Sequence, residues 1–368
     1  MPNDGTIGPG RSAWKRLKKN KGAMFGLFII CVSVLIALTC YLIAADSSSN
    51  ANRMVIEIGG KKPGYSQLYL KIPIREKQDK NFFTRLIEGS TDIYQYVPIT
   101  NYVEKNDSLI IDKYIDEGLI EKQSYSIAQL NGNFPPNTFK VERIHYWLGT
   151  DKYGRDILSR LLIGVRVSLA VGLVTVIISL SIGVLLGAIA GYFRGWVDDA
   201  VMWVINVIWS IPTLLLVFAI TLLLGKGFWQ IFIAIGLTMW VSVARIIRGQ
   251  VLTVRELEYI EAARALGFSK PRIIFRHILP NVMGPVLVVA ASNFATAIII
   301  EAGLSFLGVG VQPPQPSWGL MIKENYNFII TQNPMLALAP GFAIMLLVLA
   351  FNLLGNGLRD ALNVRGKI

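Results

Sequence analysis

Residues 167–193 read VSLAVGLVTVIISLSIGVLLGAIAGYF, without a single charged side chain. A helix needs about 20 mainly apolar residues to cross the hydrocarbon core of a bilayer, and this stretch exceeds that length. The chain is therefore predicted to be an all-α polytopic membrane protein with six transmembrane helices. The five other apolar stretches cover residues 24–45, 200–225, 227–244, 282–308 and 335–354.

The overall composition agrees with a membrane protein. Of the 368 residues, 53% are hydrophobic and 16% are charged, whereas soluble domains carry about 25% charged residues. This excludes a single soluble globule and a disordered chain. The net charge of +12 would suit nucleic acid, but the excess of Lys and Arg lies between apolar stretches, so no nucleic-acid partner is expected. Cys31 and Cys40 would lie about 13 Å apart along one helix, too far for a disulfide.

The positions of the basic residues predict the orientation of the chain. Lys and Arg crowd the segments before the first span, between the fourth and fifth spans, and after the sixth. The short loops on the opposite side hold only Lys226 and Lys323. Because basic residues favour short cytoplasmic loops, we expect both termini to be cytoplasmic. The expected cytoplasmic parts are the N-terminus (1–23), a loop (245–281) within a five-helix core (167–357), and the tail (358–368).

The long segment 46–166, between the first two spans, is predicted to be an extracytoplasmic α+β insertion. Residues 53–58 and 66–74 show the alternating branched and aromatic residues of strands, with Gly-Gly and Pro-Gly turns between them. Residues 102–130 mix strand and helix patterns and stay unassigned. At its end, Asp151 is a candidate helix cap. Three basic residues there are candidates for gripping lipid headgroups: Arg155, Arg160 and Arg166.

The cytoplasmic stretch 255–271 reads RELEYIEAARALGFSKP. Helix-forming residues continue up to Gly267, which is a natural helix stop, and Ser269 can cap a following helix. An apolar stripe at helical spacing is formed by Tyr259, Ala262, Ala263 and Leu266. Glu261 lies nearly opposite, three residues before Arg264. The segment is either a docking helix or an ordinary loop helix with a surface ion pair.

Several of these segments together resemble one protein family. Glu261-Ala262-Ala263, then Gly267 and later Leu279-Pro280, resemble the EAA loop of binding-protein-dependent ABC importer permeases. The stretch LGTDKYGRDILSR (148–160) resembles the segment before the second span in dipeptide, oligopeptide and nickel permeases. That resemblance implies that the three arginines named above belong to a short elbow helix instead of gripping lipid. EAGLSFLG (301–308) and PSWG (316–319) resemble the exit of the fifth span in the same subfamily.

The resemblance implies a permease of a bacterial inner membrane. Its EAA loop would be a coupling helix that docks on a cytoplasmic ATPase. The implied partners are a homologous second permease, two ATPases, an extracytoplasmic solute-binding protein and membrane lipid. The chain lacks a G-x-x-x-x-G-K phosphate loop, so ATP and magnesium would bind only to the partner ATPases, and no catalytic or metal site is expected. The implied coupling residues are Glu261, Ala262, Ala263, Gly267, Leu279 and Pro280.

The chain departs from the family pattern in two places. His277 stands two residues before the Leu-Pro, where the general pattern has Ile, and a satisfied loop histidine is favoured over a switch. Trp203 and Asn206 occupy the positions where the family usually places a basic and an acidic residue. No role of that charged pair is therefore carried over to this chain.

Within the spans, four features are candidates for packing or transport. Gly183, Gly187 and Gly191 form a small-residue ridge that packs within this chain or against a second permease. Asn293 and Thr296 line a translocation path or serve helix packing, and Glu301 is a functional candidate or a structural hydrogen-bonding group. Pro212 is expected to kink the third span and is a candidate hinge.

The favoured function is a permease subunit that imports peptides. Import of nickel or another small solute is an alternative within the same architecture. A stand-alone channel or secondary carrier is a second alternative, although such a protein would be expected to carry intramembrane charges or broken helices. An intramembrane enzyme is disfavoured, because neither H-E-x-x-H nor G-x-S-x-G occurs and neither histidine lies inside a span.

Overall fold

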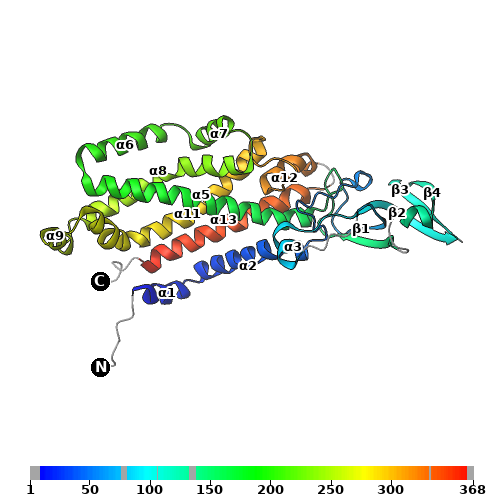
Figure 1. Ribbon diagram of the computed structural model, residues 1–368, viewed down its shortest axis with the longest axis horizontal. Coiled ribbons are helices and arrows are strands. Elements are labelled where there is room, and N and C mark those ends of the chain that lie inside the picture. The colour runs from blue at the N-terminus through cyan, green and yellow to red at the C-terminus, as the bar shows by residue number, and fades with distance from the viewer. Residues whose placement is uncertain (1–8, 76–80, 106, 132–137, 331–332, 363–368) are drawn as a thin grey trace, which may run out of the picture. The chain divides into compact units, whose positions relative to one another are not determined.

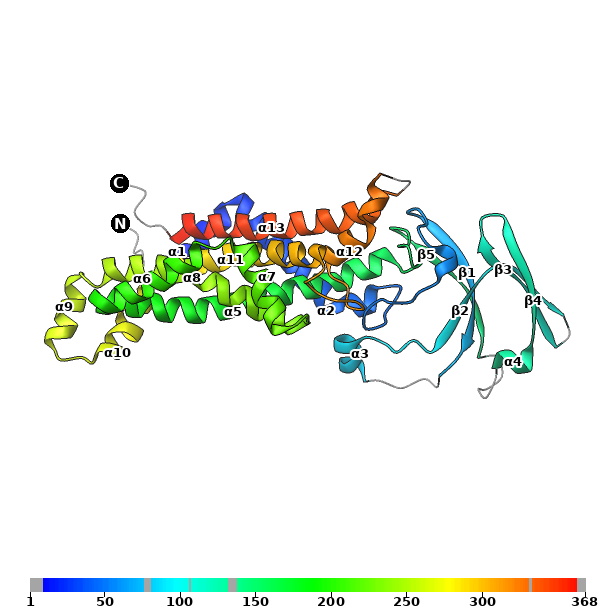
Figure 2. The same ribbon diagram turned by 90° about the horizontal axis from the view of Figure 1, so that it is seen from above.

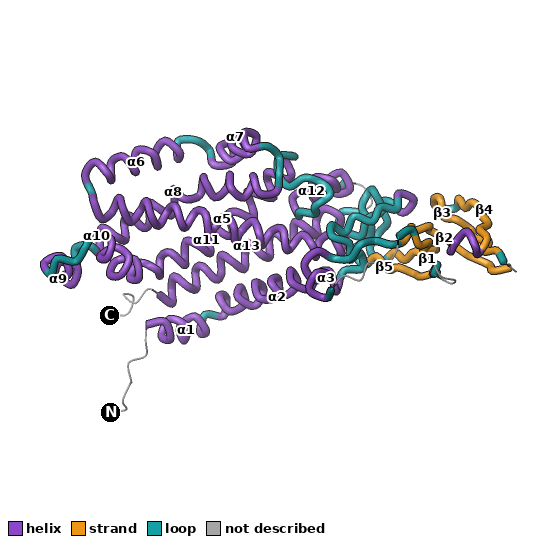
Figure 3. Tube along the Cα trace, in the orientation of Figure 1, coloured by secondary structure: helices purple, strands orange, loops and turns teal. Residues whose placement is uncertain are grey.

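The computed structural model describes residues 9–75, 81–105, 107–131, 138–330 and 333–362. The outer ends of the expected N-terminus and tail lie outside these residues. The chain divides into two compact units. The first comprises Met1–Ser33, Ser168–Gln312 and Ala343–Ile368, and the second comprises Val34–Val167 and Pro313–Phe342. Figure 1 names the helices and strands, and Figure 3 colours them by type.

Five segments of the described chain are long and apolar enough to cross a membrane. They agree with five of the six expected spans. The helix at the fourth expected span continues ten residues beyond its expected end, to Val254. The helix at the fifth expected span begins before residue 282, because a short π-helical turn joins it without a break. These segments are α2 (Lys21–Ile43), α5 (Ile157–Phe193), α8 (Phe228–Val254), α11 (Leu279–Leu307) with the preceding α10 (Lys270–Arg272) and η2 (Ile273–Ile278), and α13 (Met335–Leu362).

The third expected span is not one helix. Residues 200–225 fall on α6 (Gly195–Trp209) and α7 (Thr213–Leu224), which meet at 91°. Pro212 stands at the break with φ −54° and ψ 123°. Because proline has no N–H, it cannot continue the hydrogen bonds of α6. Its carbonyl accepts from the amide of Leu216 and so forms the first hydrogen bond of α7. The described residues thus contain five candidate spans, or six if this bent pair crosses as one, and the six-span count stays a prediction.

The core of the first unit lies where α5, α8 and α11 run side by side (Figure 1). Its fully buried side chains are aliphatic, as expected for helices that pack against one another and against lipid. Ile247 and Val251 of α8 meet Ile278 and Val282 near the start of α11 in one cluster. The amphipathic helix α1 (Pro9–Lys19) was not expected; its Leu17 packs on Ala361 of α13, within the same unit.

The second unit contains a five-stranded antiparallel sheet in the order β4-β3-β2-β1-β5 (Figure 2). Leu70, Ile99 and Ile111 point to one face and enclose Leu130 of the short helix α4. The sheet confirms an α+β insertion. Its elements are η1 (Ile56–Ile58), β1 (Tyr65–Pro73), α3 (Phe82–Glu88), β2 (Tyr94–Lys105), β3 (Ser108–Asp116), β4 (Leu119–Ser126), α4 (Ile127–Asn131) and β5 (Lys140–Tyr146).

One of the two expected strands in this unit is correct. The strand expected at 66–74 is β1, and the turns before it use Gly60 and Gly64 at positive φ. The strand expected at 53–58 is wrong. The amide of Arg53 donates to the Asp46 carboxylate and that of Val55 to the carbonyl of Tyr153, so these donors do not enter a ladder.

The turn before α5 corrects the expected role of Asp151. Asp151 does not cap a helix: its carboxylate accepts from the amides of Tyr153 and Arg155 and closes the turn between them. Asp156 caps α5 instead, accepting from the amide of Ser159 at 2.9 Å. Burial raises the pKa of the Asp156 carboxyl, although hydrogen bonds from Ser159 act the other way.

Arg155 and Arg160 are buried and do not reach for lipid, and the three arginines near this turn do not form a separate elbow helix. Arg155 lies in the turn, while Arg160 and Arg166 belong to the continuous α5. Arg155 and Arg160 are 2% and 1% exposed. Arg166 donates to the carbonyl of Ile87 at 2.9 Å. The same unit also holds two elements that were not expected, α12 (Trp318–Asn325) and η3 (Tyr326–Ile329).

Candidate functional site

The expected coupling segment forms α9 (Glu258–Ala265), an eight-residue helix that begins three residues later than the sequence suggests. It ends in a hydrogen-bonded motif in which the amide of Phe268 reaches the carbonyl of Ala263 and the amide of Gly267 reaches that of Arg264. Gly267 has φ +76°, and no other group lies within 4 Å of where its Cβ would be. The glycine is therefore required by backbone conformation alone.

The faces of α9 differ from the expected stripe. Ile260 and Ala263 are the buried pair, and they insert into the aliphatic cluster of α5, α8, η2 and α11. Ala262 and Glu261 are exposed. Tyr259 and Leu266 are 43% and 73% exposed. Of the expected apolar stripe Tyr259, Ala262, Ala263 and Leu266, only Ala263 is buried, and the other three side chains are exposed. α9 is anchored by one face and presents apolar side chains and a carboxylate on the other.

A tyrosine at the end of α5 holds the base of α9. The guanidinium groups of Arg255 and Arg264 lie 5.8 and 5.6 Å from the ring centre of Tyr192. Arg255 also donates to the carbonyl of Tyr192, and Arg264 donates to the carbonyl of Arg255 at 3.3 Å. Arg264 therefore helps to anchor α9 to the end of α5. Sequence reasoning used both arginines as orientation signals and considered Arg264 for a surface ion pair with Glu261, so it missed their contacts with Tyr192.

The Leu-Pro pair follows directly on the coupling segment. Leu279 is half-buried against the aliphatic cluster, and Pro280 occupies the first turn of α11, where a missing N–H costs no hydrogen bond. His277 lies on the π-helical turn η2, with its ring 5.8 Å from that of Phe268. Its Nε2 has no hydrogen-bond partner in the described chain. The expectation of a satisfied loop histidine is therefore wrong.

The glycine ridge of α5 faces α8. A Cβ on Gly183 would lie 2.5 Å from Cβ of Val243, and one on Gly187 would lie 2.5 Å from the carbonyl oxygen of Ala244. On Gly191 it would lie 2.9 Å from the carbonyl oxygen of Arg248. All three glycines thus occur where two helices of this chain approach too closely for any side chain.

The candidate path residues separate into two environments. Asn293 and Thr296 of α11 line a cavity of about 270 Å³ together with side chains from α6, α7 and α8. Asn293 is buried and lies 3.5 Å from the Ser179 hydroxyl of α5. Glu301 is fully buried and is not among the residues that line this cavity. It accepts from the Ser305 hydroxyl at 2.7 Å, which in turn accepts from the amide of Val311.

A charged pair joins two helices of the same unit. Arg248 of α8 binds both carboxylate oxygens of Asp198 on α6. Sequence reasoning missed this pair because its members lie 50 residues apart. Trp203 of α6, which stands where the family usually has a charge, is 68% exposed.

A bundle of apolar helices with an exposed, glycine-terminated helix between α8 and α11 defines a membrane-embedded transport component. The chain belongs to the family of binding-protein-dependent transport system inner membrane components, whose model matches residues 183–367. A second model, the N-terminal TM domain of oligopeptide transport permease C, matches residues 8–55. The chain is thus a membrane-spanning permease component and not the ATPase of such a system.

Relatives with curated names are similar over most of their length. The dipeptide transport system permease protein DppC of Alkalihalophilus pseudofirmus is 42% identical over 66% of this chain and 79% of its own. The oligopeptide transport system permease protein OppC of Bacillus subtilis is 38% identical over 69% and 82%. Glutathione permease GsiD of Pectobacterium atrosepticum is 41% identical over 63% and 78%. A solved inward facing structure of the MetNI methionine ABC transporter is 19% identical, covering 56% of this chain and 98% of its own, with a TM-score of 0.46.

Proposed function

We propose that this chain imports dipeptides and oligopeptides as one of two permeases in a bacterial inner membrane. Two cytoplasmic ATPases that bind ATP and magnesium supply the energy, and an extracytoplasmic binding protein delivers the cargo. Peptides are favoured over nickel because the relatives named above are dipeptide, oligopeptide and glutathione permeases. Both termini and α9 lie in the cytoplasm, and the insertion lies outside it, as the distribution of basic residues indicates.

The geometry of α9 carries this proposal. Ile260 and Ala263 fix the helix to the ends of the spans, so a push on α9 moves α5, α8 and α11. Its free face combines Glu261 with the exposed Tyr259 and Leu266, a mixture suited to docking in a protein groove. We assign ATPase contact to Glu261 and Ala262, packing to Ala263 and Leu279, and the shape of the two turns to Gly267 and Pro280.

Peptide uptake by cells that express the complete transporter tests the coupling assignment. Glu261→Lys reverses a charge on the docking face, and Gly267→Val puts a β-branched residue at positive φ, which costs about 1–2 kcal/mol. We expect both variants to insert at normal abundance and to lose uptake. Normal uptake in both variants at equal abundance would refute the assignment.

Each variant has a matched control. Glu104→Lys makes the same charge reversal at an exposed position of β2. Gly249→Val adds the same side chain to an exposed glycine of α8 that has open space and no positive φ. Both controls should transport normally. If a control also abolishes uptake, the loss reflects general damage and the assignment is not supported.

A further inference from the structure

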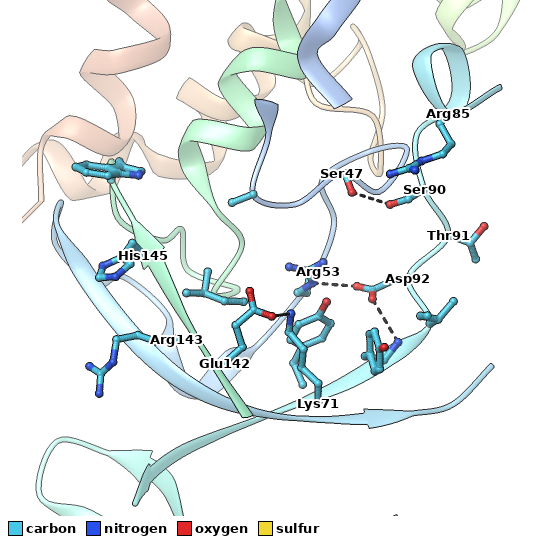
Figure 4. A pocket seen from close by; sticks show the side chains of 16 residues that line it. Ser47, Arg53, Lys71, Arg85, Ser90, Thr91, Asp92, Glu142, Arg143 and His145 are labelled. Atoms are coloured by element: carbon cyan, nitrogen blue, oxygen red, sulfur yellow. Dashed lines mark hydrogen bonds and ion pairs between the residues drawn. The ribbon is translucent and has the colours of Figure 1, made fainter. Parts of the chain in front are cut away.

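The second unit contains a pocket that the coupling and transport assignments do not use. It has a volume of about 710 Å³, within the range of small-molecule sites. Figure 4 shows its lining: the segment after α2, β1, the chain from α3 into β2, and β5. The sheet supplies one wall, so most of the lining stands on regular structure.

Ion pairs and hydrogen bonds fix the floor of the pocket. Arg53 donates to Asp92 at 2.9 Å, and its guanidinium lies 4.0 Å from the ring centre of Tyr96. Lys71 of β1 pairs with Glu142 of the neighbouring β5. At the edge, the hydroxyls of Ser47 and Ser90 are 2.7 Å apart. The cavity is therefore formed before any ligand arrives, which lowers the entropy cost of binding.

The charges that remain are positive. Four cationic side chains and two carboxylates line the pocket, and both carboxylates already pair with Arg53 and Lys71. Arg85 and Arg143 have no carboxylate partner among the described residues, and Arg143 donates to the Ser66 hydroxyl at 3.4 Å. Neighbouring residues of β5 point to opposite faces of the sheet, so the Arg143 side chain leaves β5 on the side opposite to Glu142 and lies at the rim of the pocket (Figure 4). Each is free to form a charge-assisted pair with an anionic ligand.

The rest of the lining distinguishes between anions. Asp92 and Glu142 repel a phosphate dianion and a peptide carboxylate alike. A peptide differs because it also carries an ammonium group, which Glu142 can bind alongside Lys71, since the Glu142 side chain is 55% exposed. Apolar walls for its side chains are provided by Trp147, which is 71% exposed, and by Ile93 and Ile144.

We infer that this pocket binds a short peptide through its C-terminal carboxylate, which Arg85 or Arg143 receives. The pocket would hold cargo on the unit that also contains α12, before the cargo enters the helix bundle. This inference rests on the proposed peptide import. It places a peptide-binding site on the permease itself, in addition to the site on the solute-binding protein.

Equilibrium binding to the full chain in lipid nanodiscs, without the solute-binding protein, tests the inference. The probe is the radiolabelled tripeptide Ala-Phe-Ala as the free acid, compared with its C-terminal amide. We expect saturable binding of the acid and about tenfold weaker binding of the amide, since a lost charge-assisted hydrogen bond is worth at least 1.4 kcal/mol. The double variant Arg85→Gln/Arg143→Gln should weaken binding by a similar factor, and the single variants identify the receiving arginine.

A charge-matched control and a separate uptake assay make the outcomes distinct. Lys122→Gln removes one exposed positive charge from β4, at the other edge of the sheet, and should leave binding unchanged. Equal binding of acid and amide, or of the double variant and wild type, would overturn the inference. Uptake of the same tripeptide by the complete transporter tests the proposed function separately. Normal uptake without binding by the isolated chain overturns only the pocket, whereas absent uptake contradicts peptide import.

Discussion

Arg155 Nη2 lies 2.6 Å from Glu324 Oε2, an ion pair between residues 169 positions apart. The same oxygen is 3.3 Å from Arg160, and the other side of Arg155 is bound by Asp151 at 2.6 Å. Arg155 and Arg160 are almost completely buried. The pair thus joins the turn before α5 to α12, within one unit, and both of these segments belong to the sequence motifs that resemble the peptide permeases.

Glu324→Gln should destabilise this junction. Loss of the Glu324 carboxylate leaves Arg155 paired with Asp151 alone and Arg160 without an ion-pair partner among the described residues, and breaking a buried ion pair typically costs about 3–5 kcal/mol. We expect the purified variant to unfold at a clearly lower temperature in detergent, as followed by tryptophan fluorescence. Lys323→Gln changes the exposed neighbouring residue and should unfold like wild type. Equal midpoints for both variants would mean that the pair does not stabilise the fold.

Gly187→Ala should separate α5 from α8. The new Cβ would lie 2.5 Å from the backbone oxygen of Ala244, so the helices have to move apart, at a cost of about 1–3 kcal/mol. Gly341→Ala adds the same methyl group to α13, where nothing lies within 4 Å, and is the control. Thermal unfolding of both purified variants provides the measurement. If Gly187→Ala is as stable as Gly341→Ala, close approach at this ridge is not required.

Tyr192→Ala should loosen α9 from the helix bundle. The substitution removes the ring over which Arg255 and Arg264 lie, and each partly desolvated cation–π contact is worth about 0.5–2 kcal/mol. We expect faster tryptic cleavage after these two arginines, together with reduced peptide uptake. Tyr192→Phe keeps the ring and the carbonyl that Arg255 binds, so it should behave as wild type. Identical cleavage rates in the alanine and phenylalanine variants would show that the ring does not anchor the helix.

Thr296→Val should impair uptake if the cavity beside α11 belongs to the translocation path. The substitution keeps the shape of the side chain and removes its hydroxyl from the lining that it shares with Asn293. Thr39→Val is the control, because the Thr39 hydroxyl makes the same kind of bond to the carbonyl four residues earlier, on an exposed face of α2. The measurement is initial uptake rate at equal membrane abundance. Equal rates in the two variants would count against a role of Thr296 in the path.

The elements that sequence reasoning found are those with local causes. The apolar stretch of α5 is long enough to require a helix, and the glycine at 267 requires a turn, whatever surrounds them. β1 likewise follows from alternating side chains after two glycine turns. The strand expected at 53–58 failed because residues 56–58 form the 3-10 turn η1, and because the amide of Val55 donates to Tyr153, a distant partner that no local pattern reveals.

The candidate site was predicted in part. The place of α9 and the positions of Glu261 and Gly267 follow from the sequence, but the face that α9 buries does not. Tyr259 and Leu266 fit an apolar stripe as well as Ile260 does, and only the neighbouring α5, α8 and α11 select Ile260 for burial. The partners of Arg255 and Arg155 were hidden for the same reason, since an arginine in a loop looks the same whether it faces solvent or a buried ring or carboxylate.

The sequence by itself determined the membrane class, most of the spans, the insertion and the glycine-terminated coupling segment, because length, hydrophobicity and backbone restrictions act on neighbouring residues. Only the tertiary structure decided which charges pair, which face of α9 is anchored, how sharply the third span bends at Pro212, and that the insertion encloses a pocket lined by two arginines without a carboxylate partner among the described residues. Those features depend on groups brought together from distant parts of the chain, and their free energies arise from burial and pairing that exist only after folding.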